Sequence, residues 1–242
     1  MQVAMAALQR GYNCITFEGP GQGAVIREQQ LPFRNDWEKV ITPVVDYLLT
    51  RPEVDPQRIA LMGMSLGGYL APRAAAFEHR LAACIANDGV FSFKFSDMGR
   101  EPDEEFEGDL NNQAFNMEDF ARDLMDQSTN VRWAVENGMF TYKADSIIDL
   151  VEKTEPFTLE GVADKIKCPT LVCEAENDHF FAGQPQQLYD ALTCPKSLMK
   201  FTADEGAEEH CHIGALLLFN HRLFDWLDHT LHLKEGKPLN QA

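Results

Sequence analysis

The run Gly63-Met64-Ser65-Leu66-Gly67-Gly68 constrains the fold of this chain more than any other feature of its sequence. A short apolar run, Arg58 to Met62, precedes it, and a helical pattern, Leu66 to Phe77, follows it. A Gly-x-Ser-x-Gly turn between a buried strand and a helix holds its serine on a sharp, strained backbone, which glycines accommodate. The pattern therefore predicts that Ser65 stands at the carboxyl end of a strand, as a candidate nucleophile.

The rest of the chain alternates in the same way for most of its 242 residues. Alternating strands and helices predict a parallel sheet with right-handed crossovers. The predicted strands are Tyr12–Phe17, Arg58–Met62, Leu81–Ala86, Thr170–Ala175 and Ser197–Phe201, and the predicted helices span residues 1–10, 36–49, 66–77, 185–192 and 208–231.

The alternation stops between residues 91 and 167, where the pattern predicts only short helices over 115–127, 131–139 and 144–151. We interpret this stretch as a helical cap inserted into the core. The predicted organisation is a first core part (1–90), the cap (91–167) and a second core part (168–242). Large apolar side chains of the cap are candidate substrate-binding walls, although core packing is the more common role of such residues. They are Phe91, Trp133 and Tyr142 foremost, then Phe93, Phe95, Met139 and Phe140.

The acid of a serine triad is expected in a loop at the carboxyl edge of the sheet, after the serine in sequence. Asp178 follows the predicted strand that ends at Ala175, and it is the favoured candidate. Asp88, after the strand that ends at Ala86, is its rival, and its other interpretation is a hinge residue at the entrance to the cap.

The base is expected after the last strand, where Glu208-Glu209-His210-Cys211-His212 begins the closing helix. His210 is favoured and His212 is the alternative, while His179 is too near Asp178 to replace either easily. In this scheme the histidine removes the serine proton, the aspartate holds the imidazolium and a covalent intermediate is hydrolysed. The N–H of Leu66, beside the dipole of the following helix, is the expected first donor to the oxyanion.

Composition excludes several other classes of function. The formal net charge of −17 disfavours nucleic acids and anionic membranes as partners. The six cysteines form no CxxC pair, which predicts free thiols in a reducing, cytoplasmic compartment. No signal peptide or apolar run of membrane-spanning length is expected. His210 and Cys211 are adjacent and should point apart, so no metal is expected. The Gly19–Gly23 turn lacks dinucleotide-binding spacing, so no cofactor is expected.

Four segments carry a resemblance to a known family: Phe17–Gly23 (FEGPGQG), Asp36–Glu38, Gly63–Arg73 and Glu205–Cys211. With them the chain resembles capped α/β hydrolases that process fungal polyketides, such as heptaketide pigment-precursor hydrolases and fusarin-type hydrolases. Bacterial dihydropseudooxynicotine hydrolase is a more distant member. The resemblance covers nearly the whole chain, and the combination of the glycine turn with the His-Cys segment is its specific part.

The resemblance implies an α/β-hydrolase fold, with a mainly parallel sheet flanked by helices and an inserted helical cap. It implies a triad of Ser65, Asp178 and His210, because the histidine of the family directly precedes the position of Cys211. Members cleave carbon–carbon bonds in β-diketone-like substrates, or esters and related acyl groups. The expected substrate is a small hydrophobic polyketide or polyketide–peptide intermediate of secondary metabolism.

One departure from the family is expected to matter. Members carry a long N-terminal part that supplies the first strands of the sheet and a second oxyanion donor, whereas this chain begins in the helix that follows. With those strands missing, an exposed sheet edge favours pairing with another chain, including a second copy. One alternative is therefore a shortened, weakly active or inactive relative that binds a hydrophobic metabolite or partners a full-length hydrolase. A second alternative is an acyltransferase or cyclase that uses the same nucleophile, because an alcohol or an internal amine can release an acyl-enzyme in place of water.

Overall fold

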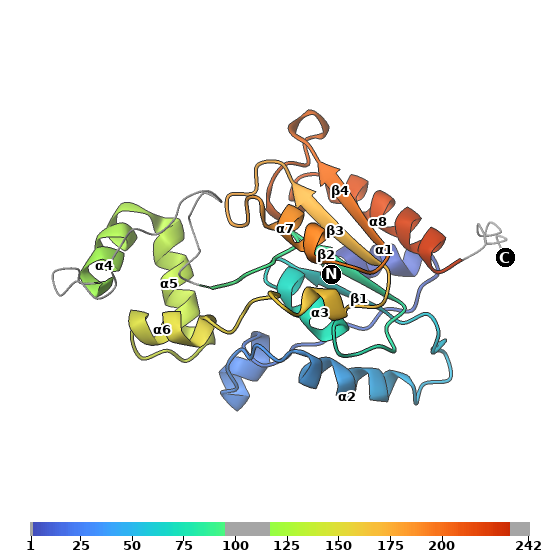
Figure 1. The fold of residues 1–242 in the computed structure, drawn as a ribbon, viewed down its shortest axis with the longest axis horizontal. Helices are drawn as coiled ribbons and strands as arrows, with labels where there is room; N and C mark the ends of the chain where they lie inside the picture. Colours follow the sequence, from blue (N-terminus) through green and yellow to red (C-terminus); the bar gives the residue numbers. More distant parts are fainter. Residues whose placement is uncertain (1, 95–116, 233–242) are drawn as a thin grey trace. The chain divides into compact units, whose positions relative to one another are not determined.

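The computed structural model describes residues 2–94 and 117–232 (Figure 1). Four parallel strands form its sheet in the order β1 (Ala60–Met64), β2 (Ala83–Asn87), β3 (Thr170–Ala175) and β4 (Lys196–Phe201). Met64 pairs with Asn87 across the first strand pair, and Ala175 pairs with Phe201 across the last. The strands therefore end together, and the loops that follow them meet at one edge of the sheet.

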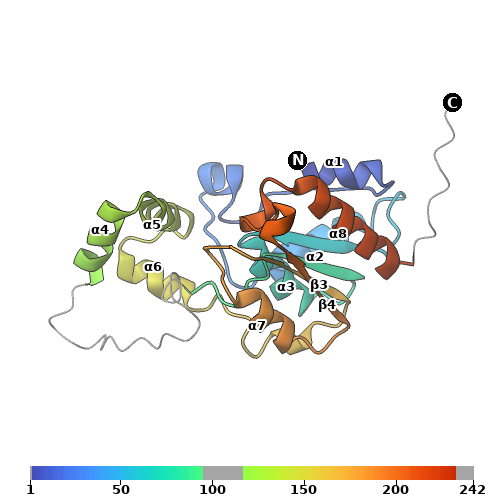
Figure 2. The same cartoon turned by 90° about the horizontal axis from the view of Figure 1, so that it is seen from above.

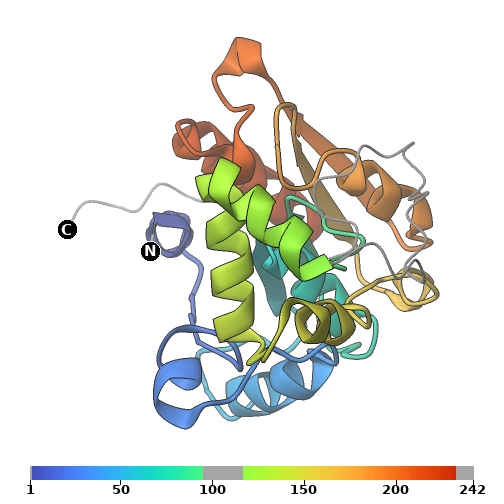
Figure 3. The ribbon, with the colours of Figure 1, turned by 90° about the vertical axis from the view of Figure 1, so that its left-hand side faces the viewer.

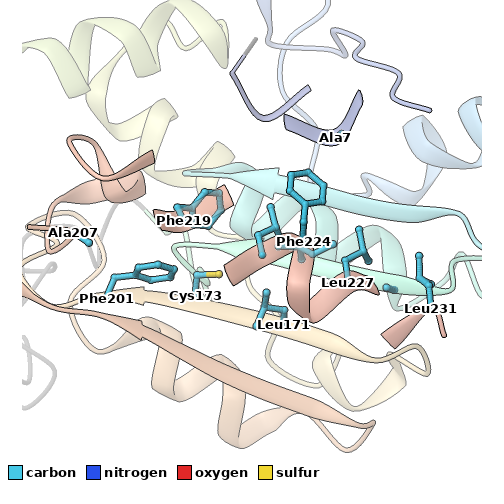
Figure 4. Packing of buried hydrophobic residues seen from close by; sticks show 12 residues of the cluster. Ala7, Leu171, Cys173, Phe201, Ala207, Phe219, Phe224, Leu227 and Leu231 are labelled. Atoms are coloured by element: carbon cyan, nitrogen blue, oxygen red, sulfur yellow. The ribbon is translucent and has the colours of Figure 1, made fainter. Parts of the chain in front are cut away.

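Helices cover both faces of this sheet (Figure 2). On one face lie α1 (Gln2–Gln9) and α8 (Leu216–Thr230), and on the other lie α3 (Gly67–Ala75) and α7 (Gln184–Ala191), with α2 (Glu38–Leu48) packed against α3. Apolar side chains of α8 and the strands form the core between them (Figure 4), which includes Ala7, Ala83, Ile85, Leu171, Cys173, Phe201, Ala207, Phe219, Leu223, Phe224, Leu227 and Leu231.

Four of the five predicted strands are confirmed, and the prediction of a strand over Tyr12–Phe17 is wrong. That segment joins no ladder, and residues 13–17 are exposed. An apolar run becomes a strand only when a neighbour accepts its backbone hydrogen bonds, and within the described residues β1 is an edge of the sheet with no strand beyond it.

The closing helix also differs from the prediction, because it starts only at Leu216. A short 3-10 helix, His210–His212, precedes it, and Gly214 has a φ of +107°. Cys211 and His212 are left-handed at φ +54° and +56°, a conformation that cannot continue an α-helix. The remaining short elements are a π-helix at Val25–Gln29 and 3-10 helices at Ala163–Lys165 and Ala203–Glu205.

The chain divides into two compact units. The first contains residues 1–16, 36–92 and 159–242, and the second contains residues 17–35 and 93–158. The second holds α4 (Met117–Gln127), α5 (Thr129–Thr141) and α6 (Ile147–Thr154), which lie side by side in Figure 3. Ala121, Val135 and Ile147 form their common core. The assignment of residues 91–167 as a cap stays a prediction.

The glycine-rich turn, residues 19–23, lies in the second unit. Gly21 donates to the Leu31 carbonyl at 2.8 Å, and Phe33 donates to the Thr141 carbonyl at 3.0 Å. Gly21 has a φ of +84°, and a Cβ on it would lie 2.2 Å from the Phe33 ring. Glycine is therefore required where this turn meets its own unit.

All six cysteines are free thiols, as expected from their spacing. Four of them are buried and only Cys14 is exposed. Across residues 2–94 and 117–232, no helix is both long enough and apolar enough to cross a membrane.

Candidate active site

Ser65 lies in the sharp turn that joins β1 to α3. Its φ is +56°, so a non-glycine residue takes the left-handed conformation, which costs about 1–2 kcal/mol. The strand–turn–helix context predicted for the Gly-x-Ser-x-Gly run is confirmed. Leu66 is the N-cap residue of α3 and already has α-helical angles. The first N–H groups of a helix have no acceptor within it, so the Leu66 N–H is suited to receive an oxyanion.

Three side chains from separate loops form one chain of hydrogen bonds. Nε2 of His210 lies 2.9 Å from Oγ of Ser65, and Nδ1 of His210 lies 2.9 Å from Oδ2 of Asp178. With the proton on Nδ1, His210 donates to the carboxylate and accepts from the Ser65 hydroxyl. The structure therefore brings together the three residues that the sequence favours.

The carboxylate of Asp178 is fixed from both sides. Its Oδ1 accepts from the backbone N–H groups of Phe180 at 2.8 Å and Phe181 at 3.4 Å, which leaves Oδ2 for His210. Burial alone would raise the pKa of Asp178, but the hydrogen bonds from His210 and Phe180 outweigh it and hold the pKa below its usual value. Asp178 therefore remains an anion beside the imidazole.

His210 is held as a stronger base than a free histidine. Burial alone would lower its pKa, but the hydrogen bond to Asp178 and the negative charges of Asp88 and Asp178 outweigh it and raise the pKa. The rings of Phe180 and Phe181 lie 4.8 Å and 5.6 Å from the imidazole, centroid to centroid. Only 16% of the His210 side chain is exposed.

His212, the alternative base, has a different environment. It is fully buried, its ring stacks between Phe201 and Phe219, and its Nδ1 lies 3.2 Å from the Ala207 carbonyl oxygen. Burial lowers its pKa to about 4, so it is neutral at pH 7. The geometry therefore favours His210 over His212. His179 is exposed.

A second carboxylate, that of Asp88, lies beside His210. The sequence predicted Asp88 only as a rival for the triad acid or as a hinge residue. Oδ2 of Asp88 is 3.3 Å from the His210 Nδ1. The same carboxylate accepts from the Cys211 N–H at 3.1 and 2.9 Å and lies 2.8 Å from the Cys211 Sγ. Asp88 is wholly buried within the first unit, and its role as a hinge residue at the entrance to the cap stays a prediction.

The expectation that His210 and Cys211 point apart is wrong. Because Cys211 is left-handed, its sulfur and a ring nitrogen of His210 come within 4.8 Å of each other and of an Asp88 oxygen. These three side chains are the group that could ligand a metal among the described residues. Their ligand atoms are engaged in the hydrogen bonds described above.

The predicted substrate-binding residues are spread over both units. Tyr142 is 5% exposed, and its ring packs 5.3 Å from Phe33 and 5.2 Å from Phe157, within the second unit. Trp133, on α5, is 59% exposed. Phe91 is half-buried, and its carbonyl accepts from Leu159 at 2.8 Å. Phe95 lies outside the described residues. Contact of these residues with a substrate stays a prediction.

The known proteins that this chain resembles are α/β hydrolases. Residues 2–216 match the model of the "Alpha/beta hydrolase family". Hydrolase acrC of Aspergillus aculeatus is 32% identical over 245 residues, which cover 96% of this chain and 56% of that protein. The 20-hydroxy-prefusarin hydrolase FUS2 of Gibberella moniliformis is 33% identical over 246 residues, which cover 96% of this chain and 58% of that protein. This chain thus spans somewhat more than half the length of these relatives.

Solved structures with the same fold include the 2,6-dihydroxy-pseudo-oxynicotine hydrolase, at a TM-score of 0.71 and 23% identity over 98% of this chain and 58% of that one. The α/β hydrolase GrgF of Penicillium sp. sh18 has a TM-score of 0.63 and 17% identity, and the match covers 96% of this chain and 84% of that one. The fold is that of an α/β hydrolase. The chain belongs to the α/β-hydrolase family, and its relatives include fungal secondary-metabolite hydrolases.

Proposed function

We propose that this chain carries the catalytic core of a serine hydrolase that cleaves a polyketide or polyketide–peptide intermediate. The observation that carries the proposal is the hydrogen-bonded chain Ser65–His210–Asp178, with 2.9 Å at each step. A strained serine at the carboxyl end of a parallel strand, facing a histidine held by an anionic carboxylate, is the arrangement that activates a serine hydroxyl.

The mechanism follows from the geometry. His210 takes the Ser65 proton on Nε2 while Oγ attacks the substrate carbonyl, and the negative charge of Asp178 stabilises the imidazolium. The Leu66 N–H donates to the developing oxyanion. The leaving group departs, an alkoxide or a stabilised carbanion, and takes the proton from His210. Water, deprotonated by His210, then hydrolyses the acyl-enzyme, and the proton returns to Ser65.

The substrate class rests on the relatives. One of them is named a 20-hydroxy-prefusarin hydrolase, and others are hydrolases of Aspergillus aculeatus and Fusarium. We infer a small hydrophobic substrate of that kind, with a carbonyl group as the point of attack. The second unit, which contains α4, α5 and α6, is the proposed cap that selects it.

A serine-directed fluorophosphonate tests the nucleophile. Intact-protein mass spectrometry is expected to show one adduct on the wild type and none on Ser65→Ala. Ser197→Ala is the matched control, because the Ser197 hydroxyl accepts from Trp226 at 3.1 Å and no histidine among the described residues hydrogen-bonds to it. Absence of an adduct on folded wild-type protein would sink the proposal and favour a relative that only binds a metabolite.

Product analysis separates hydrolysis from acyl transfer. Mass spectrometry of a reaction with a β-diketone substrate in ¹⁸O water is expected to show one ¹⁸O atom in the released acid. An unlabelled cyclic or transferred product would instead favour an acyltransferase or cyclase, because an internal or added nucleophile would then have opened the acyl-enzyme in place of water.

A further inference from the structure

The turn that carries His210 is strained and needs an anchor. Cys211 and His212 are consecutive non-glycine residues with φ of +54° and +56°. Such conformations persist only where surrounding contacts hold them. The Cys211 N–H, in the middle of the turn, donates to both oxygens of the Asp88 carboxylate at 3.1 and 2.9 Å. Asp88 thus fixes the backbone directly after His210.

The position of Asp88 is itself tightly determined. It follows β2 directly and is left-handed at φ +58°. A Cβ on Gly68, in the first turn of α3, would lie 2.7 Å from the Asp88 carbonyl oxygen, so the backbone of Asp88 packs directly against the helix that follows Ser65. Gly89, the next residue, donates to the Cys173 carbonyl in β3 at 3.2 Å. A rigid part of the sheet therefore holds the carboxylate.

The thiol of Cys211 completes the connection between base and nucleophile. Its Sγ lies 2.8 Å from the Asp88 Oδ2. Burial, followed by the negative charge of Asp88, raises the pKa of the thiol well above its usual value, whereas a hydrogen bond from the Ser65 backbone opposes that rise. The thiol therefore stays protonated, donates to Asp88 and lies against the backbone of the nucleophile.

We propose that Asp88 and Cys211 form a buried positioning pair that sets the geometry and basicity of His210, with Asp88 as a second carboxylate on Nδ1 beside Asp178. The inference rests on the proposed hydrolase function. The Nδ1 atom of His210 contacts two carboxylates: it lies 2.9 Å from Oδ2 of Asp178 and 3.3 Å from Oδ2 of Asp88. The ring is thereby held in line with Ser65 from two loops.

The electrostatics agree with this role. Burial outweighs the hydrogen bond from the Cys211 thiol and the charge of His210, so the pKa of Asp88 is raised above its usual value. Among the described residues, the titratable groups that face His210 are Asp178 after β3, Asp88 after β2, and Cys211 and His212 on its own turn. Two of these are carboxylates, and both raise the pKa of His210.

The test is Asp88→Asn, which keeps the size of the side chain but removes its charge. With p-nitrophenyl butyrate as substrate, we expect kcat to fall at least about tenfold with KM nearly unchanged, since positioning acts on the transition state. We also expect the acid limb of kcat/KM to move down by about half a pH unit or more, since a charge near His210 is lost. Asp190→Asn, which removes an exposed carboxylate on α7, is the control and should change neither.

Two further variants, at Cys211, test the inference even if Asp88→Asn does not fold. Cys211→Ser keeps a donor to Asp88 and should retain kcat within about threefold, whereas Cys211→Ala loses it and should fall about tenfold. A folded Asp88→Asn with the wild-type kcat and pH limb would overturn the inference. So would Cys211→Ala and Cys211→Ser variants that both keep the wild-type kcat.

A readout without substrate separates this inference from the proposed function. NMR titration of the His210 imidazole in ¹⁵N-histidine-labelled protein should give a lower pKa in Asp88→Asn than in the wild type. If the wild type hydrolyses no ester but the His210 pKa falls, the proposed function fails and the positioning of His210 by Asp88 stands. If the wild type is active and the His210 pKa does not move, the inference fails alone.

Discussion

A Cβ added to Gly63 would lie 1.9 Å from the carbonyl oxygen of Gly67. The obstructing atom belongs to the backbone at the start of α3, so it cannot move aside without displacing the turn that holds Ser65. Gly67 itself meets no such obstacle: a Cβ there has nothing within 4 Å among the described residues, and its φ is not left-handed. Although both glycines flank the serine in sequence, only Gly63 is required by sterics.

Gly63→Ala is therefore expected to destabilise the protein by roughly 2–4 kcal/mol, or to prevent folding, because a backbone clash cannot be relieved locally. Gly67→Ala is the matched control and should keep or raise the melting temperature, since alanine is the better residue in the first turn of a helix. Thermal unfolding followed by circular dichroism compares them. Equal melting temperatures for the two variants would contradict the steric argument.

Only part of the fold and of the candidate site could be predicted from the sequence. Local patterns predict the strand, the turn and the helix around Ser65. Parallel strands all end at one edge of the sheet, and this predicts that Ser65 meets Asp178 and His210 there. The contacts of Asp88 do not follow, because they depend on the left-handed angles of Cys211, which no spacing rule predicts for a cysteine. The sequence also could not place Tyr12–Phe17, because a strand needs a partner that lies elsewhere in the fold.

Asp178→Asn should reduce kcat by roughly 10²–10⁴-fold, because the amide can no longer stabilise the imidazolium or fix the tautomer. The pKa of His210 is raised by the hydrogen bond to Asp178, so its loss lowers that pKa. The acid limb of the kcat/KM profile should accordingly move to lower pH while the plateau falls. Stopped-flow measurements with p-nitrophenyl butyrate between pH 5 and 9 report both. A wild-type plateau in the variant would remove Asp178 from the proposed triad.

His212 makes the stability of the folded protein depend on pH. Its pKa is lowered by burial to about 4, whereas in the unfolded chain it is near 6.5. The unfolded state therefore binds the proton more readily, and stability falls as the pH drops from about 6.5 to 4. The full loss is about 3 kcal/mol, since each pH unit of difference is worth about 1.4 kcal/mol.

His212→Asn should flatten this part of the stability profile, and asparagine tolerates the left-handed angle at this position. Urea unfolding at pH 7 and pH 4.5 measures the change. His221→Asn is the control, because the His221 side chain is 70% exposed and its replacement should leave the slope as in the wild type. Identical slopes for wild type and His212→Asn would show that His212 titrates normally in the folded protein.

Glu78 is a buried carboxylate on which the packing of α2 depends. It accepts from Arg80 at 2.7 and 2.6 Å and from Thr42, on α2, at 2.9 Å. The hydrogen bond from Arg80 is the main cause that lowers the pKa of Glu78 to about 2. Stability from this group is present above the unfolded pKa of about 4.3 and is lost as the pH falls toward 2.

Glu78→Gln should cost roughly 1–2 kcal/mol at pH 7, a value reduced for the partial exposure of Arg80, and almost nothing at pH 2. The matched control is Glu53→Gln, because Glu53 pairs with Arg51 on the surface and its loss should not be measurable. Urea unfolding of both variants at the two pH values gives the comparison. An equal cost at pH 7 and pH 2 would mean that the charge of Glu78 contributes nothing.

Tyr142 and Trp133 separate packing from substrate contact in the second unit. Tyr142 is buried between Phe33 and Phe157, so Tyr142→Ala should destabilise that unit by roughly 3–5 kcal/mol, as loss of a buried aromatic ring does. Trp133 is 59% exposed, and Trp133→Ala should change stability by less than about 0.5 kcal/mol. Hydrogen exchange of α5 and α6 reports the difference between them.

Kinetics then decide the role of Trp133. If its ring binds the acyl chain of the substrate, Trp133→Ala should raise KM for p-nitrophenyl octanoate several-fold and leave kcat unchanged, because contact with an unreactive part of the substrate is made equally in the ground and transition states. The same variant should keep the wild-type KM for p-nitrophenyl acetate, which has no chain to bind. An unchanged KM for the long ester would leave Trp133 as a surface residue without a role in substrate binding.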